Sequence, residues 1–227
     1  MRKIELLIFD MAGTVVNEDN VVYKTLEKAI NRYGYEVDLD FVLEHGAGKE
    51  KYQAIKDILG KMGYDEIEER ADVIFEIFQK FLKEAYDSLT VTSFEGVEEL
   101  ISLIWATNIK IALNTGYDKV TAKKLLQKMN WKIGVHYDLL VTADDTKNGR
   151  PHPDMILIAM ERLGVTDPSK VLKAGDSIID IQEGKNANAG LTIGVTTGAH
   201  TREQLMSANP DYVFDSLFEL TKVIELK

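Results

Sequence analysis

The sequence predicts an α/β fold, in which a parallel β-sheet is covered by helices on both faces and interrupted by an inserted block of helices. From about Ser93 onward, short continuous apolar runs alternate with amphipathic segments, a pattern typical of strands buried on both faces of a parallel sheet. Between about Asn20 and Asp87, apolar residues recur at helical spacing alone. One apolar run, 6–9, precedes this block, so the block is inserted after the first strand.

The first strand ends on Asp10 and breaks at once into a turn of small residues. A carboxylate is thereby placed at the C-terminal edge of a buried strand, where open parallel sheets keep their reactive groups. In the second half of the chain, strands and helices alternate, with right-handed crossovers by default. Strands are expected over 109–113, 137–142, 171–174, 191–195 and 212–214, and helices over 118–129, 153–163, 178–187 and from Leu217 onward.

Two amphipathic stripes define the inserted block and predict a packed helical interior. The first stripe consists of Val22, Leu26, Ala29, Ile30 and Tyr33, and the second of Ile67, Ala71, Ile74, Phe75, Phe78, Phe81, Leu82 and Ala85. Another helix is expected over 51–59. The predicted division is a core domain of residues 1–16 and 91–227 and a helical domain of residues 17–90.

Composition limits the possible functions. The 227 residues, 45% of them apolar, suit one core domain with an insertion. The absence of cysteine excludes disulfides and thiolate metal sites and suits a reducing cytoplasm. No apolar stretch approaches the ~20 residues needed to span a bilayer. A net charge of −10 argues against a nucleic-acid surface. We therefore expect a cytoplasmic protein that binds a small molecule and neither nucleic acid nor membrane.

Four separate segments whose side chains could take part in catalysis fall at the expected strand ends. They are Asp10-Met11-Ala12-Gly13-Thr14, Asn114-Thr115-Gly116, Gly149-Arg150-Pro151 and Gly175-Asp176, the last with Asp180 four residues on. Four residues are about one helical turn, so the carboxylates of Asp176 and Asp180 can face the same point.

The side chains of these four segments together suit a site that binds a metal ion and a phosphoryl group. Three carboxylates without cysteine or a histidine cluster are hard oxygen ligands that suit Mg²⁺. The Thr115 hydroxyl, backbone N–H groups at helix N-termini and Arg150 suit a phosphoryl group. A carboxylate beside a divalent ion can attack phosphorus and form an aspartyl-phosphate. Asp10 is the expected nucleophile.

In this order, the four pieces resemble the four sequence motifs of the haloacid dehalogenase superfamily, over nearly the whole chain. The resemblance implies a Rossmann-like core with an α-helical cap inserted after the first strand, and Mg²⁺ as cofactor. It also implies roles for individual residues: Asp10 as nucleophile and metal ligand, the Ala12 carbonyl and Asp176 as further ligands, Asp180 as support for the metal, Thr115 and Gly116 as phosphate-binding residues, and Arg150 as the cation that stabilises nucleophile and phosphate.

Ala12 limits the reactions that this site can catalyse. Most phosphatases of the superfamily carry Asp two residues after the nucleophile, where it protonates the departing oxygen, a role worth about 10²–10⁴ in rate. Cleavage of a C–P bond avoids this need, because a lysine Schiff base can receive the electrons as an enamine. The phosphonatases of the superfamily work in this way and have Ala at this place. The chain resembles them at Asp10–Thr14, Thr115-Gly116-Tyr117, Asp144-Asp145, Gly149-Arg150-Pro151 and 183–187.

The lysine would come from the inserted helices. Gly46-Ala47-Gly48-Lys49 resembles the phosphonatase segment that carries the Schiff-base lysine, so Lys49 is the expected catalytic amine, with Lys51 as a neighbour that could lower its pKa. One departure is Tyr52, which stands where phosphonatases have a histidine three residues after that lysine.

Other functions stay open. Segment 196–201 resembles small-molecule phosphatases such as phosphoglycolate phosphatase, so a phosphomonoesterase is the alternative enzyme. A phospho-accepting signalling receiver is disfavoured, because receivers lack such an insertion, and a non-catalytic binding protein on the same fold is a further alternative. The apolar face of the insertion leaves a homodimer possible.

Overall fold

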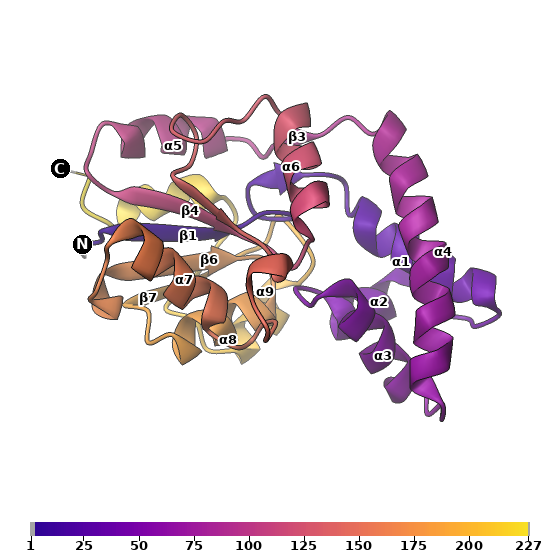
Figure 1. Ribbon diagram of the computed structural model, residues 1–227. Coiled ribbons are helices and arrows are strands. Elements are labelled where there is room, and N and C mark those ends of the chain that lie inside the picture. Colours follow the sequence, from indigo (N-terminus) through magenta and orange to yellow (C-terminus); the bar gives the residue numbers. More distant parts are fainter. Residues whose placement is uncertain (1–2, 227) are drawn as a thin grey trace.

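The computed structural model describes residues 3–226, and its centre is a parallel β-sheet (Figure 1). Its strands are β1 (Leu6–Asp10), β4 (Lys110–Asn114), β5 (Leu139–Val141), β6 (Val171–Gly175), β7 (Leu191–Val195) and β8 (Tyr212–Phe214). Their spatial order is β5-β4-β1-β6-β7-β8, and every pairing between them is parallel. The predicted α/β class, a Rossmann-like parallel sheet flanked by helices, is confirmed.

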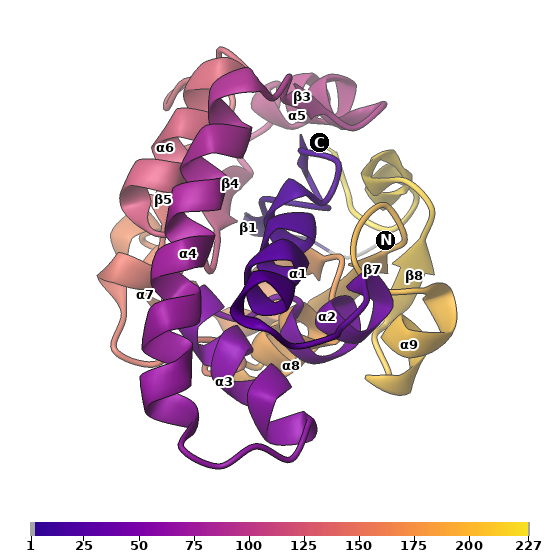
Figure 2. The same cartoon turned by 90° about the vertical axis from the view of Figure 1, so that its right-hand side faces the viewer.

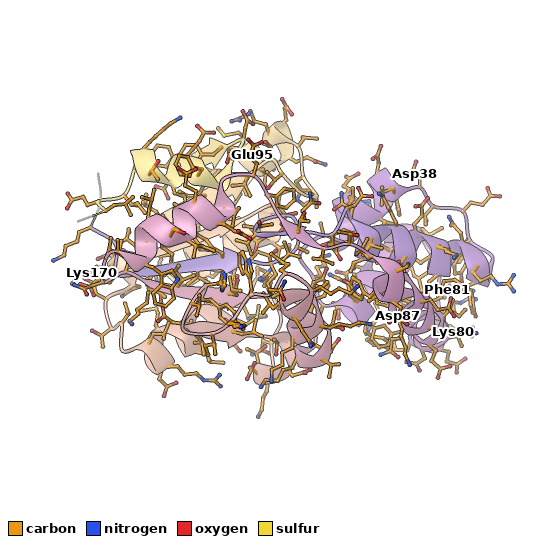
Figure 3. The ribbon with its side chains drawn as sticks, turned by 90° about the horizontal axis from the view of Figure 1, so that it is seen from above. Asp38, Lys80, Phe81, Asp87, Glu95 and Lys170 are labelled. Carbon is orange, nitrogen blue, oxygen red and sulfur yellow. The ribbon has the colours of Figure 1, made fainter. Side chains whose placement is uncertain are left out.

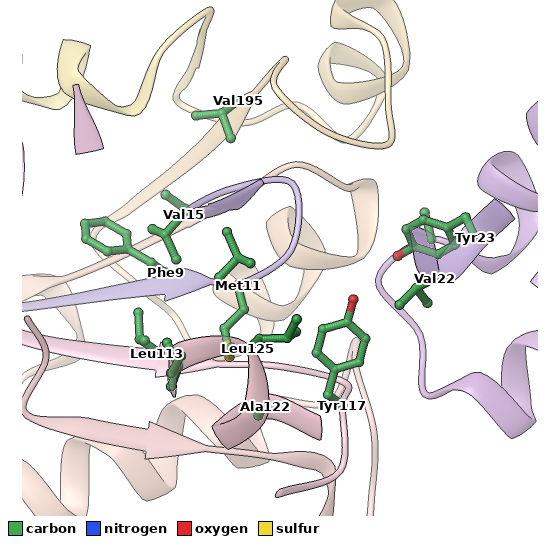
Figure 4. Packing of buried hydrophobic residues seen from close by; sticks show 14 of the residues in the cluster. Phe9, Met11, Val15, Val22, Tyr23, Leu113, Tyr117, Ala122, Leu125 and Val195 are labelled. Carbon is green, nitrogen blue, oxygen red and sulfur yellow. The ribbon is translucent and has the colours of Figure 1, made fainter. Parts of the chain in front are cut away.

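The side chains of β1 alternate between two apolar layers. Leu6 and Ile8 pack against α7 (Asp154–Leu163) on one face of the sheet. Leu7 and Phe9 pack in the other layer, which includes α5 (Val97–Trp105) and α6 (Lys119–Lys128); Figure 4 shows Met11, which follows β1, beside Leu125 of α6. Because both faces of β1 are buried, its sequence is a continuous apolar run.

Four helices of the insertion pack on one another at one end of the sheet: α1 (Val21–Tyr33), α2 (Leu39–Gly46), α3 (Lys51–Lys61) and α4 (Ile67–Ser88). Seen from that end, α4 runs beside α1 and α3 (Figure 2). The two connections to the sheet lie together, because β2 (Val16–Asn17) and β3 (Thr92–Ser93) pair antiparallel. These strands fall next to the predicted domain edges; the division into two domains stays a prediction, and residues 1, 2 and 227 of its core part lie outside the described residues.

A side-chain hydrogen bond also connects the insertion to a helix that packs on the sheet. Asp87, on the part of α4 nearer the sheet in Figure 3, accepts a hydrogen bond from the Lys124 amine of α6 at 2.8 Å. Lys80 and Phe81 lie farther out on the same helix. No helix within residues 3–226 is long and apolar enough to cross a membrane.

The structure also contains elements that the sequence pattern did not predict. Helices α2, α5 and α9 (Arg202–Ser207) are six to nine residues long, too short to set a clear apolar period. The chain after Leu217, predicted as an ordinary helix, is a 3₁₀-helix, Leu217–Lys222. Two shorter 3₁₀-helices, Ala143–Asp145 and Pro168–Lys170, precede α7 and β6, and α8 (Ile178–Asn186) follows β6.

Candidate active site

The topology brings the predicted strand-end residues to one edge of the sheet. Strand β1 lies between β4 and β6, so Asp10, Asn114 and Gly175 end three adjacent parallel strands. Thr115 and Gly116 continue from β4, and Asp176 continues from β6. The side chains of Asp10, Thr115 and Asp176 are all buried.

Three carboxylates gather at this edge. One oxygen each from Asp10, Asp176 and Asp180 lies within 4.8 Å of the other two. Asp180 reaches this position from the first turn of α8, where the Ser177 hydroxyl and backbone N–H donate to its carboxylate. Asp176 accepts a hydrogen bond from the Ala199 backbone N–H at 2.6 Å. Gly13, at φ +81°, leaves room for Asp176, because a Cβ there would fall on its carboxylate.

Arg150 links the nucleophile candidate to its surroundings. Its Nη1 donates to Asp10 Oδ1 at 2.6 Å and lies 3.0 Å from Asp180 Oδ1. Its Nη2 donates to the backbone oxygen of Asn114 at 2.8 Å, and its Nε lies 3.2 Å from Glu183 Oε2. The guanidinium is thus fixed beside Asp10 by several partners at once.

The sequence pattern did not single out Lys173, which lies behind these residues. Lys173, fully buried in β6, lies 2.8 Å from Asp180 Oδ1 and donates to Asn114 Oδ1 at 2.7 Å. The Asn114 amide in turn donates to Glu183. A lysine between apolar residues of a buried strand is the signal that could have identified Lys173, since a buried ammonium needs an anionic partner.

The charges at this edge favour a divalent cation. Among residues 3–226, four buried carboxylates meet two buried cations here: Asp10, Asp176, Asp180 and Glu183 against Arg150 and Lys173. Burial raises the pKa of Asp10, and burial with the nearby Asp10 and Asp180 raises the pKa of Asp176 well above its usual value. A divalent ion would compensate this excess negative charge, and carboxylate oxygens are the ligands that Mg²⁺ prefers.

Asp180 behaves differently from the other two carboxylates. Burial acts to raise its pKa, but Arg150 and Lys173 outweigh burial and bring the pKa down to about 2. Asp180 is therefore ionised and already neutralised by protein cations, which suits a supporting position beside a metal ion more than a direct ligand.

Asp10 faces a small chamber. Its lining includes Asp10, Ala12, Tyr23, Gly48, Lys51, Thr115, Gly116, Tyr117 and Arg150, and its volume is about 10 Å³. That is space for about one water molecule. A larger cavity of about 620 Å³ lies between α4 and α6 and shares Lys51, Gly116 and Tyr117 with the chamber. The amine of Lys51 is thus placed where the two spaces meet.

The structure brings Lys51, and not the amine of Lys49, to the chamber. Lys51 is 7% exposed, and burial lowers its pKa to about 8, although Asp10, Glu50 and Glu18 act in the opposite direction. Lys49 forms a short, half-exposed ion pair with Asp57 and lines a separate cavity on α3. The hydroxyl of Tyr52 donates to Asp72 on the exposed side of the insertion.

Close backbone contacts seat the segment before α3 on the sheet edge. Gly48 has φ +75°, and a Cβ there would lie 2.5 Å from the Ser177 hydroxyl. Its N–H donates to the Tyr23 hydroxyl at 3.0 Å. A Cβ on Gly116 would lie 3.1 Å from the Lys49 carbonyl oxygen. These glycines let the segment approach closely enough for Lys51 to reach the chamber.

Comparisons with known proteins agree with this geometry. Residues 7–207 match the family described as haloacid dehalogenase-like hydrolase. A phosphonoacetaldehyde hydrolase of Latilactobacillus sakei is 29% identical, over 99% of this chain and 96% of the relative. A phosphoglycolate phosphatase of Salmonella typhimurium is 24% identical, over 100% of this chain and 94% of the relative. A solved phosphonoacetaldehyde hydrolase-like protein from Oleispira antarctica has the same fold, with a TM-score of 0.81 at 24% identity over 98% of this chain and 91% of that one.

Proposed function

The chain belongs to the haloacid dehalogenase-like hydrolases, and on this basis we propose that it cleaves the C–P bond of a small phosphonate, with Asp10 as nucleophile, Lys51 as the amine and Mg²⁺ as cofactor. One observation carries the proposal. A buried amine with a lowered pKa shares a small chamber with Asp10 at a site where Ala12 offers no acid. The names of the relatives support a substrate of this class.

Phosphoryl transfer begins at Asp10. Its carboxylate attacks phosphorus, so an O–P bond forms as the C–P bond breaks, and water then hydrolyses the aspartyl-phosphate. Arg150 holds Asp10 and balances charge on the phosphoryl oxygens, and Thr115 with the backbone of Gly116 binds those oxygens. Mg²⁺, held by Asp10, the Ala12 carbonyl and Asp176 with Asp180 in support, would supply the remaining positive charge.

The Lys51 amine receives the other half of the substrate. Its neutral form condenses with the aldehyde carbon, releasing water, and the imine takes up a proton to become an iminium, which accepts the electron pair of the breaking C–P bond as an enamine. Protonation of the enamine carbon and hydrolysis then release acetaldehyde and the free amine. A pKa of about 8 leaves a useful fraction of this buried amine neutral near pH 7.5. This assignment replaces Lys49, whose amine lies at another cavity.

A phosphomonoesterase resembling phosphoglycolate phosphatase is the second candidate, and the same amine favours it. In that reaction Asp10 attacks the phosphate ester and the P–O bond breaks. The Lys51 ammonium would give a proton to the departing oxygen, in place of the aspartate that Ala12 replaces, and would regain it from water. The phosphoglycolate phosphatase relative supports this alternative.

Access to the chamber needs movement, since about 10 Å³ does not admit a substrate. We assign residues 17–90 as a cap domain that opens about its two adjacent connections and excludes water on closing. The proposed setting is the cytoplasm, with a small-molecule partner, and a homodimer remains open to measurement.

Product analysis tests the proposal. With phosphonoacetaldehyde and Mg²⁺, the protein should release phosphate and acetaldehyde in equal amounts, and far faster than it releases phosphate from phosphoglycolate. Phosphate from phosphoglycolate with none from the phosphonate would establish the second candidate instead. Asp10→Asn should stop both reactions while its thermal unfolding stays close to wild type; turnover at the wild-type rate would rule out Asp10 as nucleophile.

A further inference from the structure

Glu18 is a buried carboxylate that the proposed reaction does not use. It lies in the first connection, between β2 and α1, and is 2% exposed. Its Oε2 accepts a hydrogen bond from the Tyr86 hydroxyl at 2.8 Å, and its Oε1 accepts one from the Tyr117 hydroxyl at 3.1 Å. Tyr86 belongs to the last turns of α4, and Tyr117 follows β4. One carboxyl group thus joins the start of the insertion, its end and the sheet edge.

Tyr117, which donates to the Glu18 carboxyl group, also has its ring beside the Lys51 amine. The Lys51 Nζ is 5.6 Å from the centre of the Tyr117 ring and 5.0 Å from that of Tyr23. Both tyrosines direct their hydroxyls into the space between the insertion and the sheet in Figure 4. Aromatic faces at this distance attract an ammonium group, so the position of the Tyr117 ring helps to fix the position of the amine.

Charge couples the two groups as well. Burial raises the pKa of Glu18 to about 7. The two tyrosine hydrogen bonds and the charge of Lys51 act to lower this pKa, but burial outweighs them. Glu18 in turn favours the charged form of Lys51, together with Asp10 and Glu50, whereas Arg150 disfavours it. Of these neighbours, Asp10 and Arg150 are bound to each other, and Glu50 is engaged with backbone N–H groups at the start of α3.

We propose that Glu18 is the positioning residue of the Lys51 amine: it fixes the Tyr117 ring beside the amine and, together with Asp10 and Glu50, contributes negative charge near it. The use of this amine in catalysis rests on the proposed function, whereas the pairing itself does not. Because Glu18 also binds Tyr86, rotation of the insertion would move the carboxylate relative to Tyr117. The contact of the amine with the Tyr117 ring therefore depends on the insertion being seated on the sheet edge, whereas its hydrogen bond to the Lys49 carbonyl lies within the insertion.

Direct titration of Lys51 tests the pairing without any substrate. The full chain is labelled with lysine carrying ¹³C at the ε carbon, and the signals of Lys51 and Lys49 are identified by their loss in Lys51→Arg and Lys49→Arg. Glu18→Gln keeps the side-chain shape but removes the charge. In this variant the Lys51 midpoint should fall by about half a unit or more, which is less than the roughly 1–3 units that a directly adjacent opposite charge contributes. The Lys49 midpoint in the same spectra should not move.

Two further variants make the test specific. Glu68→Gln removes an exposed charge that pairs with Lys56 on the same insertion, and it should leave the Lys51 midpoint unchanged. Tyr86→Phe removes a hydrogen bond that favours ionised Glu18, so it should lower the Lys51 midpoint in the same direction but less. Equal Lys51 midpoints in the wild type, Glu18→Gln and Tyr86→Phe would overturn the proposal. A shift in a protein that releases no phosphate from phosphonoacetaldehyde would support the pairing and refute only the proposed function.

Discussion

The Lys51 amine donates a hydrogen bond to the carbonyl oxygen of Lys49 at 2.7 Å, yet the amines of these two lysines line different cavities. Lys51 lines the small chamber together with Asp10, and Lys49 pairs with Asp57 on the outer side of α3. Because the two lysines are so close in the chain, separate substitutions distinguish a catalytic amine from a general effect of positive charge near the sheet edge.

Borohydride reduction in the presence of phosphonoacetaldehyde should attach the two-carbon fragment to Lys51. Lys51→Ala should lose the adduct and reduce C–P cleavage by a factor on the order of 10³, within the range for a lost acid–base group. Lys49→Ala, the matched control, should keep both. Peptide mapping by mass spectrometry locates the adduct, and its appearance on Lys49 would contradict the assignment of Lys51.

Mg²⁺ should stabilise the fold, and more at pH 8 than at pH 5. The raised pKa values of Asp10 and Asp176 mean that protons compete with the metal for these carboxylates in mild acid. Thermal unfolding with Mg²⁺ or with EDTA at the two pH values measures the difference. Asp176→Asn should remove most of the Mg²⁺-dependent increase in Tm. An equal increase in this variant and in the wild type would mean that the metal binds elsewhere.

The sheet edge could be predicted because topology alone determines it. Apolar runs that end on Asp10, Asn114 and Gly175 become adjacent parallel strands, so the residues that follow them meet without any knowledge of packing. Asp176 and Asp180 also meet there, because Asp176 directly follows β6 and Asp180 lies in the first turn of α8. The grouping of these side chains was therefore accessible from the sequence, whereas their roles stay proposals.

The contribution of the insertion could not be predicted in the same way. Whether Lys49 or Lys51 faces Asp10 depends on the residue at which α3 starts and on how Gly48 rests on Ser177, and both are set by tertiary contacts. The role of Glu18 depends on Tyr86 and Tyr117, which are 68 and 99 residues away in the chain.

Gly48→Ala should reduce turnover much more than it reduces stability. Alanine at φ +75° costs about 1–2 kcal/mol, and its Cβ would also meet the Ser177 hydroxyl and push the segment that carries Lys51 off the sheet edge. Gly63→Ala is the matched control, because Gly63 has φ +79° and nothing within 4 Å of an added Cβ. Gly48→Ala should lose at least as much stability in urea as Gly63→Ala, because its Cβ also meets Ser177, and only Gly48→Ala should lose C–P cleavage. Equal turnover in the two variants would show that the close approach of Gly48 is not needed.

Ala12→Asp should create phosphomonoesterase activity. A carboxyl group here would lie in the chamber with Asp10 and could protonate a departing alkoxide, which corresponds to about 10²–10⁴ in rate for an ester with a poor leaving group. Phosphoglycolate hydrolysis measures the gain, and Ala12→Asn, similar in size but without a transferable proton, is the control. An unchanged rate in Ala12→Asp would indicate that the native site already supplies the proton, as the phosphomonoesterase alternative requires of Lys51.

Glu18→Gln should stabilise the protein relative to the wild type at pH 7.5 but not at pH 5. The folded pKa of Glu18 is raised to about 7 from 4.5, so the folded state binds its proton more tightly than the unfolded chain. That contribution is fully present below pH 4.5 and is lost as the pH rises through 7, and between pH 5 and 7.5 the loss amounts to about 2 kcal/mol. Glutamine can still hydrogen bond to both tyrosines, and it has no ionised form whose burial would destabilise the folded state. The free energy of unfolding in urea, measured for both proteins at the two pH values, should therefore diverge toward neutral pH. A constant difference across this range would show that Glu18 titrates normally in the folded protein and that its burial between Tyr86 and Tyr117 has no electrostatic cost.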